Sequence, residues 1–137
     1  MRKFLSSVSS TYKNEINRQS LRIAFFGEDS FSAVVVESLI KAGHEIAVVV
    51  IPKYNSNAYL RLYSLVERYG LKWILEKDIN SPIVVAAVEN ARPDIGILVH
   101  FAKIIRDGLL KCASMGFINF HPSRLPYYRG LHRSTGR

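Results

Sequence analysis

Five short, mostly apolar runs alternate along the chain with segments that carry apolar residues at helical spacing. The runs lie at residues 21–26, 45–51, 71–75, 95–99 and 117–120. Runs of this length are typical of strands that are buried on both faces. Strict alternation of such strands with helices predicts an α/β fold, a doubly wound and mostly parallel sheet covered by helices on both faces. Ligands of such folds bind beyond the carboxyl ends of the strands.

The segments between the runs carry helix start and stop signals. Asp29 or Ser30 can cap a helix that Gly43 ends, and Ser81 precedes Pro82, a residue favoured at the first helical position. We expect helices at about 30–42, 57–69, 82–91 and 103–111. Helical spacing places apolar residues of the first two helices inward, namely Phe31, Val34, Val35, Leu39, Leu60, Leu62, Tyr63, Leu65 and Val66.

Composition narrows the class of protein. The 137 residues suffice for one domain with a core, and no apolar run approaches the roughly 20 residues of a membrane helix. The net charge is +8, but residues 21–120 carry only +1, without the basic runs of RNA-binding proteins. Any contact with a polyanion is therefore expected from the two ends of the chain.

Cysteine and histidine usage predicts neither disulfides nor a metal site. Cys112 is the only cysteine, which favours a reducing compartment, and the four histidines lack zinc-ligand spacing. We expect a cytoplasmic protein with a flexible lead over residues 1–20. A mitochondrial protein remains the alternative, because that basic lead has some features of a transit peptide.

The last apolar run ends in a polar loop. Side chains alternate along a strand, so Asn119 and His121 share one face while Phe120 points to the other. Pro122 and Pro126 stiffen the loop that follows. An amide donor beside an imidazole suits acyl transfer, because one can stabilise an oxyanion and the other can move a proton.

Two further loops are expected at the ligand end of the sheet. Residues 27–31 contain one glycine only and two acidic residues, so they predict a tight turn rather than a dinucleotide-binding loop. His100 and Phe101 follow the fourth run, where an aromatic ring can wall a planar ligand or simply close the end of the sheet. Both interpretations of that loop remain open.

Residues 119–130, NFHPSRLPYYRG, resemble the N-x-H-P-S-L-L-P-x-Y-R-G motif of the 10-formyltetrahydrofolate-dependent formyltransferases. Residues 22–27 (RIAFFG) with Phe31, and residues 42–45 (AGHE), are similar to the members that formylate methionyl-tRNA. The resemblance implies a Rossmann-like formyltransferase fold over residues 21–130, followed by an irregular basic tail at 131–137. It implies that 10-formyltetrahydrofolate donates a formyl group to an amine.

The resemblance also implies roles for individual residues. Asn119 would bind the formyl oxygen as it gains charge, and His121 would assist there and move a proton from the amine. The pteridine and its pocket would involve a set drawn from two loops: His100, Phe101, Ala102, Lys103, Ile104, Ile105, Ser123, Leu125 and Pro126. No metal ion is implied.

Three departures from the family pattern shape the expectation. In the family, the catalytic aspartate lies farther from the motif histidine than this sequence extends, because this sequence ends 16 residues after His121. Arg124 replaces a leucine of the motif, and the loop after the second run lacks the basic insertion of tRNA-formylating members. We therefore expect a truncated member, incomplete at its C-terminus, with impaired transfer.

Several functions remain open. Methionyl-tRNA is the favoured acceptor, although the short second loop does not support tRNA, and an amino sugar nucleotide is the competing acceptor. The chain could instead be an inactive remnant, a folate-binding module, a formylfolate hydrolase or an unrelated nucleotide-binding domain. We expect no membrane partner, and an open sheet edge favours self-association.

Overall fold

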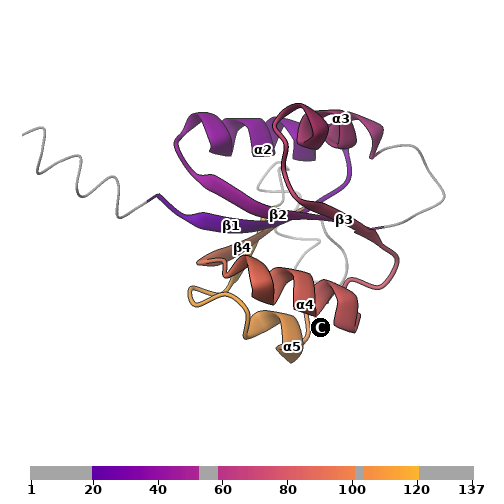
Figure 1. Ribbon diagram of the computed structural model, residues 1–137, viewed down its shortest axis with the longest axis vertical. Coiled ribbons are helices and arrows are strands. Elements are labelled where there is room, and N and C mark those ends of the chain that lie inside the picture. Colours follow the sequence, from indigo (N-terminus) through magenta and orange to yellow (C-terminus); the bar gives the residue numbers. More distant parts are fainter. Residues whose placement is uncertain (1–19, 53–58, 101–103, 121–137) are drawn as a thin grey trace, which may run out of the picture.

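The computed structural model describes residues 20–52, 59–100 and 104–120 (Figure 1). Strands and helices alternate strictly, as predicted. The elements are β1 (Arg22–Phe26), α2 (Ser30–Lys41), β2 (Glu45–Pro52), α3 (Leu60–Arg68), β3 (Trp73–Glu76), α4 (Pro82–Ala91), β4 (Ile95–Val99), α5 (Asp107–Leu110) and β5 (Phe117–Phe120). Of the predicted lead only Ser20 is described, and the predicted tail at 131–137 lies outside the described residues.

The described strands form one sheet in the order β3-β2-β1-β4-β5, and every pair is parallel. Helices α2 and α3 cover one face, and α4 and α5 cover the other (Figure 1). This arrangement confirms the doubly wound fold. From β1 the chain adds β2 and β3 on one side and then returns to add β4 and β5 on the other side of β1. The order of strands therefore reverses between β1 and β4, and folds of this kind bind ligands at that point.

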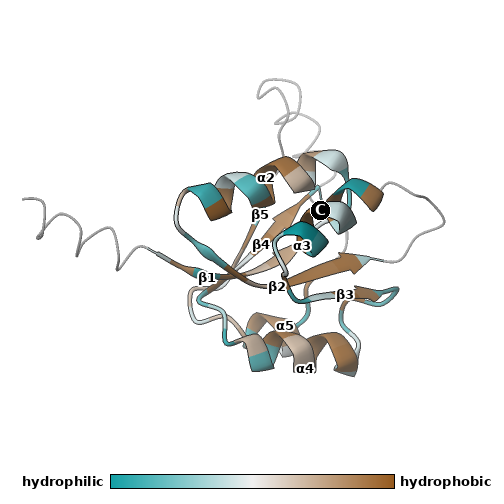
Figure 2. Ribbon diagram, turned by 45° about the horizontal axis from the view of Figure 1, so that its top comes forward, coloured by the Kyte–Doolittle hydropathy of each residue, from teal (hydrophilic) through white to brown (hydrophobic). Residues whose placement is uncertain are grey.

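A separate apolar core lies on each face of the sheet. Ile23 and Phe25 of β1 pack with Val36 under α2, whereas Ala24 and Phe26 pack with Val84 under α4. Successive residues of a strand point to opposite faces, so one continuous apolar strand supplies both cores. Figure 2 shows the same pattern as brown strands between helices of mixed hydropathy.

The structure corrects some details of the predicted elements. Val34, predicted to point inward, is 56% exposed, because three consecutive valines at 100° per residue cannot share one face. Leu60 is exposed in the first turn of α3. Helix α5 is shorter than the predicted 103–111, and β2 includes Pro52, which pairs with Glu76 at the end of β3.

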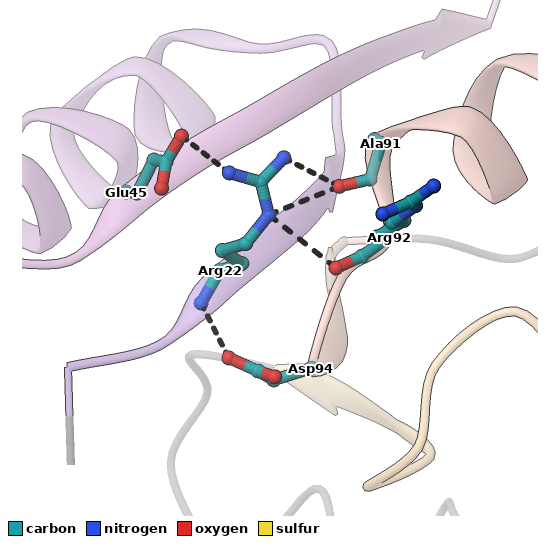
Figure 3. A network of polar contacts seen from close by, with 5 residues as sticks. All are labelled: Arg22, Glu45, Ala91, Arg92 and Asp94. Carbon is teal, nitrogen blue, oxygen red and sulfur yellow. Dashed lines mark hydrogen bonds and ion pairs between the residues drawn. The ribbon is translucent and has the colours of Figure 1, made fainter. Parts of the chain in front are cut away.

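Arg22 ties three elements together at the amino edge of the sheet (Figure 3). Its Nε donates to the carbonyl oxygens of Ala91 at 3.0 Å and Arg92 at 3.3 Å, and its Nη1 lies 2.6 Å from Glu45 Oε2. The Arg22 backbone N–H also donates to Asp94 Oδ2 at 2.8 Å. The guanidinium thus satisfies carbonyls at the C-terminal end of α4 that helix geometry leaves without partners.

None of the helices in the described residues is long and apolar enough to cross a membrane. Within the same residues, no group of three or more His, Cys, Asp or Glu side chains is placed to hold a metal ion.

Candidate active site at the carboxyl edge of the sheet

Three neighbouring strands end at one edge of the sheet. Strands β1, β4 and β5 are adjacent and parallel, so their carboxyl ends meet there. The turn after β1 and the residue after β4, His100, flank the point where strand order reverses. The site is built from these two segments and the end of β5.

The turn after β1 is tight and ends in the cap of α2. A Cβ on Gly27 would lie 2.3 Å from Ser32 Oγ, so only glycine fits this close approach. Asp29 Oδ1 accepts from both the backbone N–H and the hydroxyl of Ser32, each at 2.8 Å. Asp29 is therefore the N-cap of α2, and the predicted tight turn with acidic capping is confirmed.

The second oxygen of the same carboxylate contacts the histidine that follows β4. Asp29 Oδ2 lies 2.6 Å from His100 Nδ1, although the two residues are 71 positions apart. The His100 backbone N–H donates to Phe120 O at 3.2 Å, which anchors the residue to β5. Its φ is 55°, a left-handed conformation that favours glycine, and its side chain is 42% exposed.

Burial and hydrogen bonding shift the pKa values of the two carboxyl groups in this turn. Burial raises the pKa of Asp29, but hydrogen bonds from His100 and Ser32 outweigh burial and leave that pKa below its ordinary value. Burial, followed by the nearby Asp29 charge, raises the pKa of Glu28. Because an ionised carboxylate only accepts hydrogen bonds, His100 Nδ1 carries the proton of the Asp29–His100 contact.

Aromatic rings line the same edge. The Phe31 ring lies 5.4 Å from the His100 ring and 6.0 Å from the Phe120 ring, measured between centroids. Phe31 and Phe120 are stacked at an interplanar angle of 26°, and Phe120 is 49% exposed. Two stacked rings with an exposed face provide a flat apolar surface beside the Asp29–His100 pair.

Asn119 lies on the other face of β5. It pairs with Leu98, which belongs to the core under α4 and α5, whereas Phe120 pairs with Val99 and contacts Phe31 of α2. Parallel partners point to the same face, so Asn119 and Phe120 face opposite ways, as strand alternation predicts. Asn119 is exposed at the carboxyl edge.

The predicted site residues divide into three groups. Asn119 of β5 and His100, directly after β4, come to the same carboxyl edge of the sheet. They lie toward opposite faces there, because Asn119 is on the α4 face and the His100 ring contacts Phe31 of α2. Ile104 is exposed, and Ile105 packs against the core under α4 and α5. Outside the described residues lie Phe101, Ala102, Lys103, His121, Ser123, Leu125 and Pro126.

Sequence reasoning misses two features of this site. It assigns Asp29 only to the helix cap, and Phe31 only to the helix interior. The sequence cue that points to this site is the predicted topology, which places the turn after β1 and the loop after β4 at the same ligand-binding end of the sheet. Which side chains meet there depends on β1 and β4 being neighbours, and sequence order does not give that.

Residues 21–135 match the formyl transferase family. The chain belongs to this family. Curated relatives include the methionyl-tRNA formyltransferases of Chloroflexus aurantiacus, which is 32% identical over 116 residues, and Thermotoga maritima, which is 30% identical over 116 residues. Each alignment covers 80% of this chain and 37% of the relative.

The methionyl-tRNA formyltransferase of Roseiflexus castenholzii is 30% identical over 118 residues, covering 81% of this chain and 38% of that protein. The chain thus spans less than two fifths of the length of these relatives. The match confirms the family inferred from the motif at residues 119–130 and from the segments before it. The five-stranded parallel sheet is accordingly the Rossmann-like fold of this family.

Proposed function

We propose that this chain takes part in formyl transfer from 10-formyltetrahydrofolate to an amine. The observation that carries the proposal is the family match over residues 21–135, which contains the whole carboxyl edge of the sheet. The formylfolate, a family donor, supplies an activated formyl group. The chain supplies polar groups and a flat apolar surface at one edge of the sheet.

In this proposal Asn119 stabilises the charge that develops on the formyl oxygen. It is exposed near the end of β5, beside β4, the strand that His100 directly follows. A preorganised amide donor of this kind contributes through electrostatics, and its removal typically lowers the rate about 100- to 1000-fold. His121, two residues farther along and outside the described residues, is assigned by the family motif to assist at the same oxygen.

The donor's planar ring fits an edge that offers both apolar and polar contacts. The exposed Phe120 ring, stacked on Phe31, is a surface on which such a ring can rest. The His100 backbone N–H already donates to Phe120 O, and the Ile104 carbonyl already accepts from Asn80 Nδ2 at 2.8 Å. Backbone contacts with the ring would come from the loop of His100, Phe101, Ala102, Lys103, Ile104 and Ile105, with Ser123, Leu125 and Pro126 shaping the pocket.

Methionyl-tRNA is the favoured acceptor, because the relatives are named for it. Residues 21–120 carry a net charge of only +1, so tRNA contacts would come from the basic ends of the chain. An amino sugar nucleotide and water are the competing acceptors. A folate-binding module without turnover is the competing role.

One pair of measurements separates these functions. The 137-residue chain is incubated with 10-formyltetrahydrofolate and, in turn, methionyl-tRNA, an amino sugar nucleotide or buffer alone, and the formylated product or free formate is quantified. Formylmethionyl-tRNA is the expected product. Formate alone would identify a hydrolase, and formylation of the sugar alone would overturn the choice of acceptor.

Calorimetry with the folate and with a nicotinamide dinucleotide completes the test. We expect binding of the folate only. Folate binding without turnover would reduce the function to that of a binding module. Binding of the dinucleotide alone would overturn the proposal, because the turn after β1 then holds a pyrophosphate in spite of its two acidic residues.

Self-association through the outer side of β5 is part of the same proposal. β5 lies at one edge of the described sheet, with β3 at the other, and Ile118 and Phe120 are 53% and 49% exposed. An apolar strand at the margin of a sheet can pair with another copy of the chain.

A further inference from the structure

We propose that Asn80 is a positioning residue for the folate donor, because its side-chain amide holds the end of the loop after β4 that lies on the same face of the sheet as Asn119. The inference rests on the proposed function and adds a residue from the turn between β3 and α4, outside the motif at residues 119–130. Asn80 acts through Ile104 and Ile105 of that loop rather than on the reacting atoms.

The amide of Asn80 bridges two backbone groups of the loop. Its Nδ2 donates to the Ile104 carbonyl oxygen at 2.8 Å, and its Oδ1 accepts from the Arg106 backbone N–H at 2.9 Å. Residues 104–106 belong to no helix or strand, so the side chain supplies the pairing that regular structure would otherwise give. One amide that both donates and accepts thus fixes the backbone on each side of Ile105.

Asn80 reaches the loop from a fixed base. It lies between Ile79, which is 1% exposed in the core under α4 and α5, and Ser81, the N-cap of α4. The backbone N–H of Asn80 donates to Asp78 Oδ1 at 3.0 Å, and that of Ser81 donates to the Asp78 carbonyl oxygen at 3.0 Å. The turn is therefore tied to both the core and the helix, and the position of the amide is set by them.

The end of the loop that Asn80 holds lies on the Asn119 face of the sheet. Ile105 packs against the core under α4 and α5, and Asn119 pairs with Leu98, which belongs to the same core. The other end of the loop, at His100, lies toward α2. Asn80 thus controls the part of the loop on the side of the amide that is proposed to stabilise the formyl oxygen.

A stabilising role alone does not account for the two bonds. Ile104 is 77% exposed, more than any other exposed large apolar residue in the described part of the chain, and Arg106 is exposed as well. Water can satisfy backbone groups in such residues, so the net stability gained from these bonds is small. An apolar side chain held exposed beyond the carboxyl end of a strand is suited to contact a planar ligand.

The expected effect of the amide is on donor binding. A loop end that already has its bound conformation does not have to be ordered when the folate arrives, which strengthens binding. Without the amide, the chain near Ile104 would adopt other conformations, and the folate would bind more weakly. The kinetic signature is a raised KM for the folate, with a smaller change in kcat and an unchanged KM for the acceptor.

The first test is calorimetry with 10-formyltetrahydrofolate. Asn80→Ala removes both bonds to the loop and should raise the Kd about 10-fold or more. Asn90→Ala is the matched control, because it makes the same substitution at an exposed asparagine near the C-terminal end of the same helix, and it should bind like the wild type.

The second test separates loop position from stability. Ile46→Val trims the core under α2 and α3, so it should lower the melting temperature but keep the donor Kd. Asn80→Asp suits the turn and still accepts from Arg106, but its ionised carboxylate cannot donate to Ile104. It should also raise the Kd about 10-fold, and it decides the question if Asn80→Ala does not fold.

The outcomes separate the two proposals. If the wild type does not bind the folate, the proposed function fails and the role of Asn80 fails with it. If the wild type binds the folate without turnover, formyl transfer fails, whereas a 10-fold weaker Asn80→Ala still supports positioning. If the folded Asn80 variants bind like the wild type, the inference alone is overturned. An equal loss of affinity in Ile46→Val would overturn it as well, because stability would then govern binding.

Discussion

Asp29 uses both carboxylate oxygens and accepts three hydrogen bonds, two from Ser32 and one from His100. Burial alone would raise its pKa, but these bonds outweigh burial and lower it. A carboxyl group with a lowered folded-state pKa stabilises the fold above its unfolded pKa, near 3.8, and this contribution is lost as the pH falls through the folded value.

We therefore predict that acid weakens the wild type more than Asp29→Asn. Urea unfolding between about pH 3 and pH 7 should show the free energy of unfolding falling below about pH 4, with a shallower fall in the variant. Asparagine keeps the cap of α2, so the two proteins should differ mainly in this slope. Identical slopes would show that the Asp29 bonds do not favour the ionised form.

Gly96 leaves room for an aromatic ring on the neighbouring strand. Gly96 and Phe117 are register partners, and a Cβ on Gly96 would lie 2.2 Å from carbons of the Phe117 ring. Gly96→Ala should lower the free energy of unfolding by about 1–3 kcal/mol through overpacking, measured by urea unfolding.

Gly108→Ala is the matched control for that substitution. Its added Cβ would meet Val85 Cγ2 at 3.7 Å, an ordinary contact, and alanine is the better helix former in α5. The control should be as stable as the wild type or slightly more stable. An equal loss in both variants would refute the packing explanation.

At the scale of elements, Arg22 joins β1, β2 and the end of α4 (Figure 3). Arg22→Met keeps the apolar stem and removes the guanidinium. The last turn of α4 should then exchange its amide hydrogens faster, with a loss of about 1 kcal/mol in the free energy of unfolding.

Arg68→Met serves as the comparison for Arg22→Met. Arg68 pairs with Glu37 at 3.0 Å on the surface, between α3 and α2, and such exposed pairs contribute little. Its loss should stay within about 0.5 kcal/mol. Equal effects of the two variants would mean that Arg22 is merely another surface charge.

Elements with strong local signals are predictable from the sequence. Helix α4 begins at Pro82, after the Ser81 cap, and β4 and β5 have the bounds of their apolar runs. The orientation of α2 and the length of α5 are not predictable in this way. Consecutive valines leave the buried face of α2 ambiguous, and tertiary contacts decide how far a short helix extends.

At the scale of the whole molecule, the sequence predicts the ligand edge but not the pair that lies there. Alternation implies that the loops after β1 and β4 share one end of the sheet. Contact between Asp29 and His100 requires those two strands to be neighbours, although β2 and β3 come between them in the chain. Long-range pairing of this kind is a property of the assembled sheet.

The outer side of β5 gives a prediction about assembly. Sedimentation velocity should show concentration-dependent self-association of the wild type. Ile118→Lys should reduce this self-association, because a charge on an edge strand opposes pairing with another copy of the chain. Val34→Lys places the same charge on the exposed side of α2 and should leave association unchanged. A monomeric wild type at all concentrations would contradict this prediction.

The most direct measurement of the central claim is the rate of formyl transfer from 10-formyltetrahydrofolate by the wild type and by Asn119→Ala. Asn119 is exposed at the end of β5, so the variant should fold normally and its unfolding curve provides the control. We predict transfer by the wild type and a loss of about 100- to 1000-fold in the variant. Equal rates in two well-folded proteins would contradict a formyl-transfer site at this edge of the sheet.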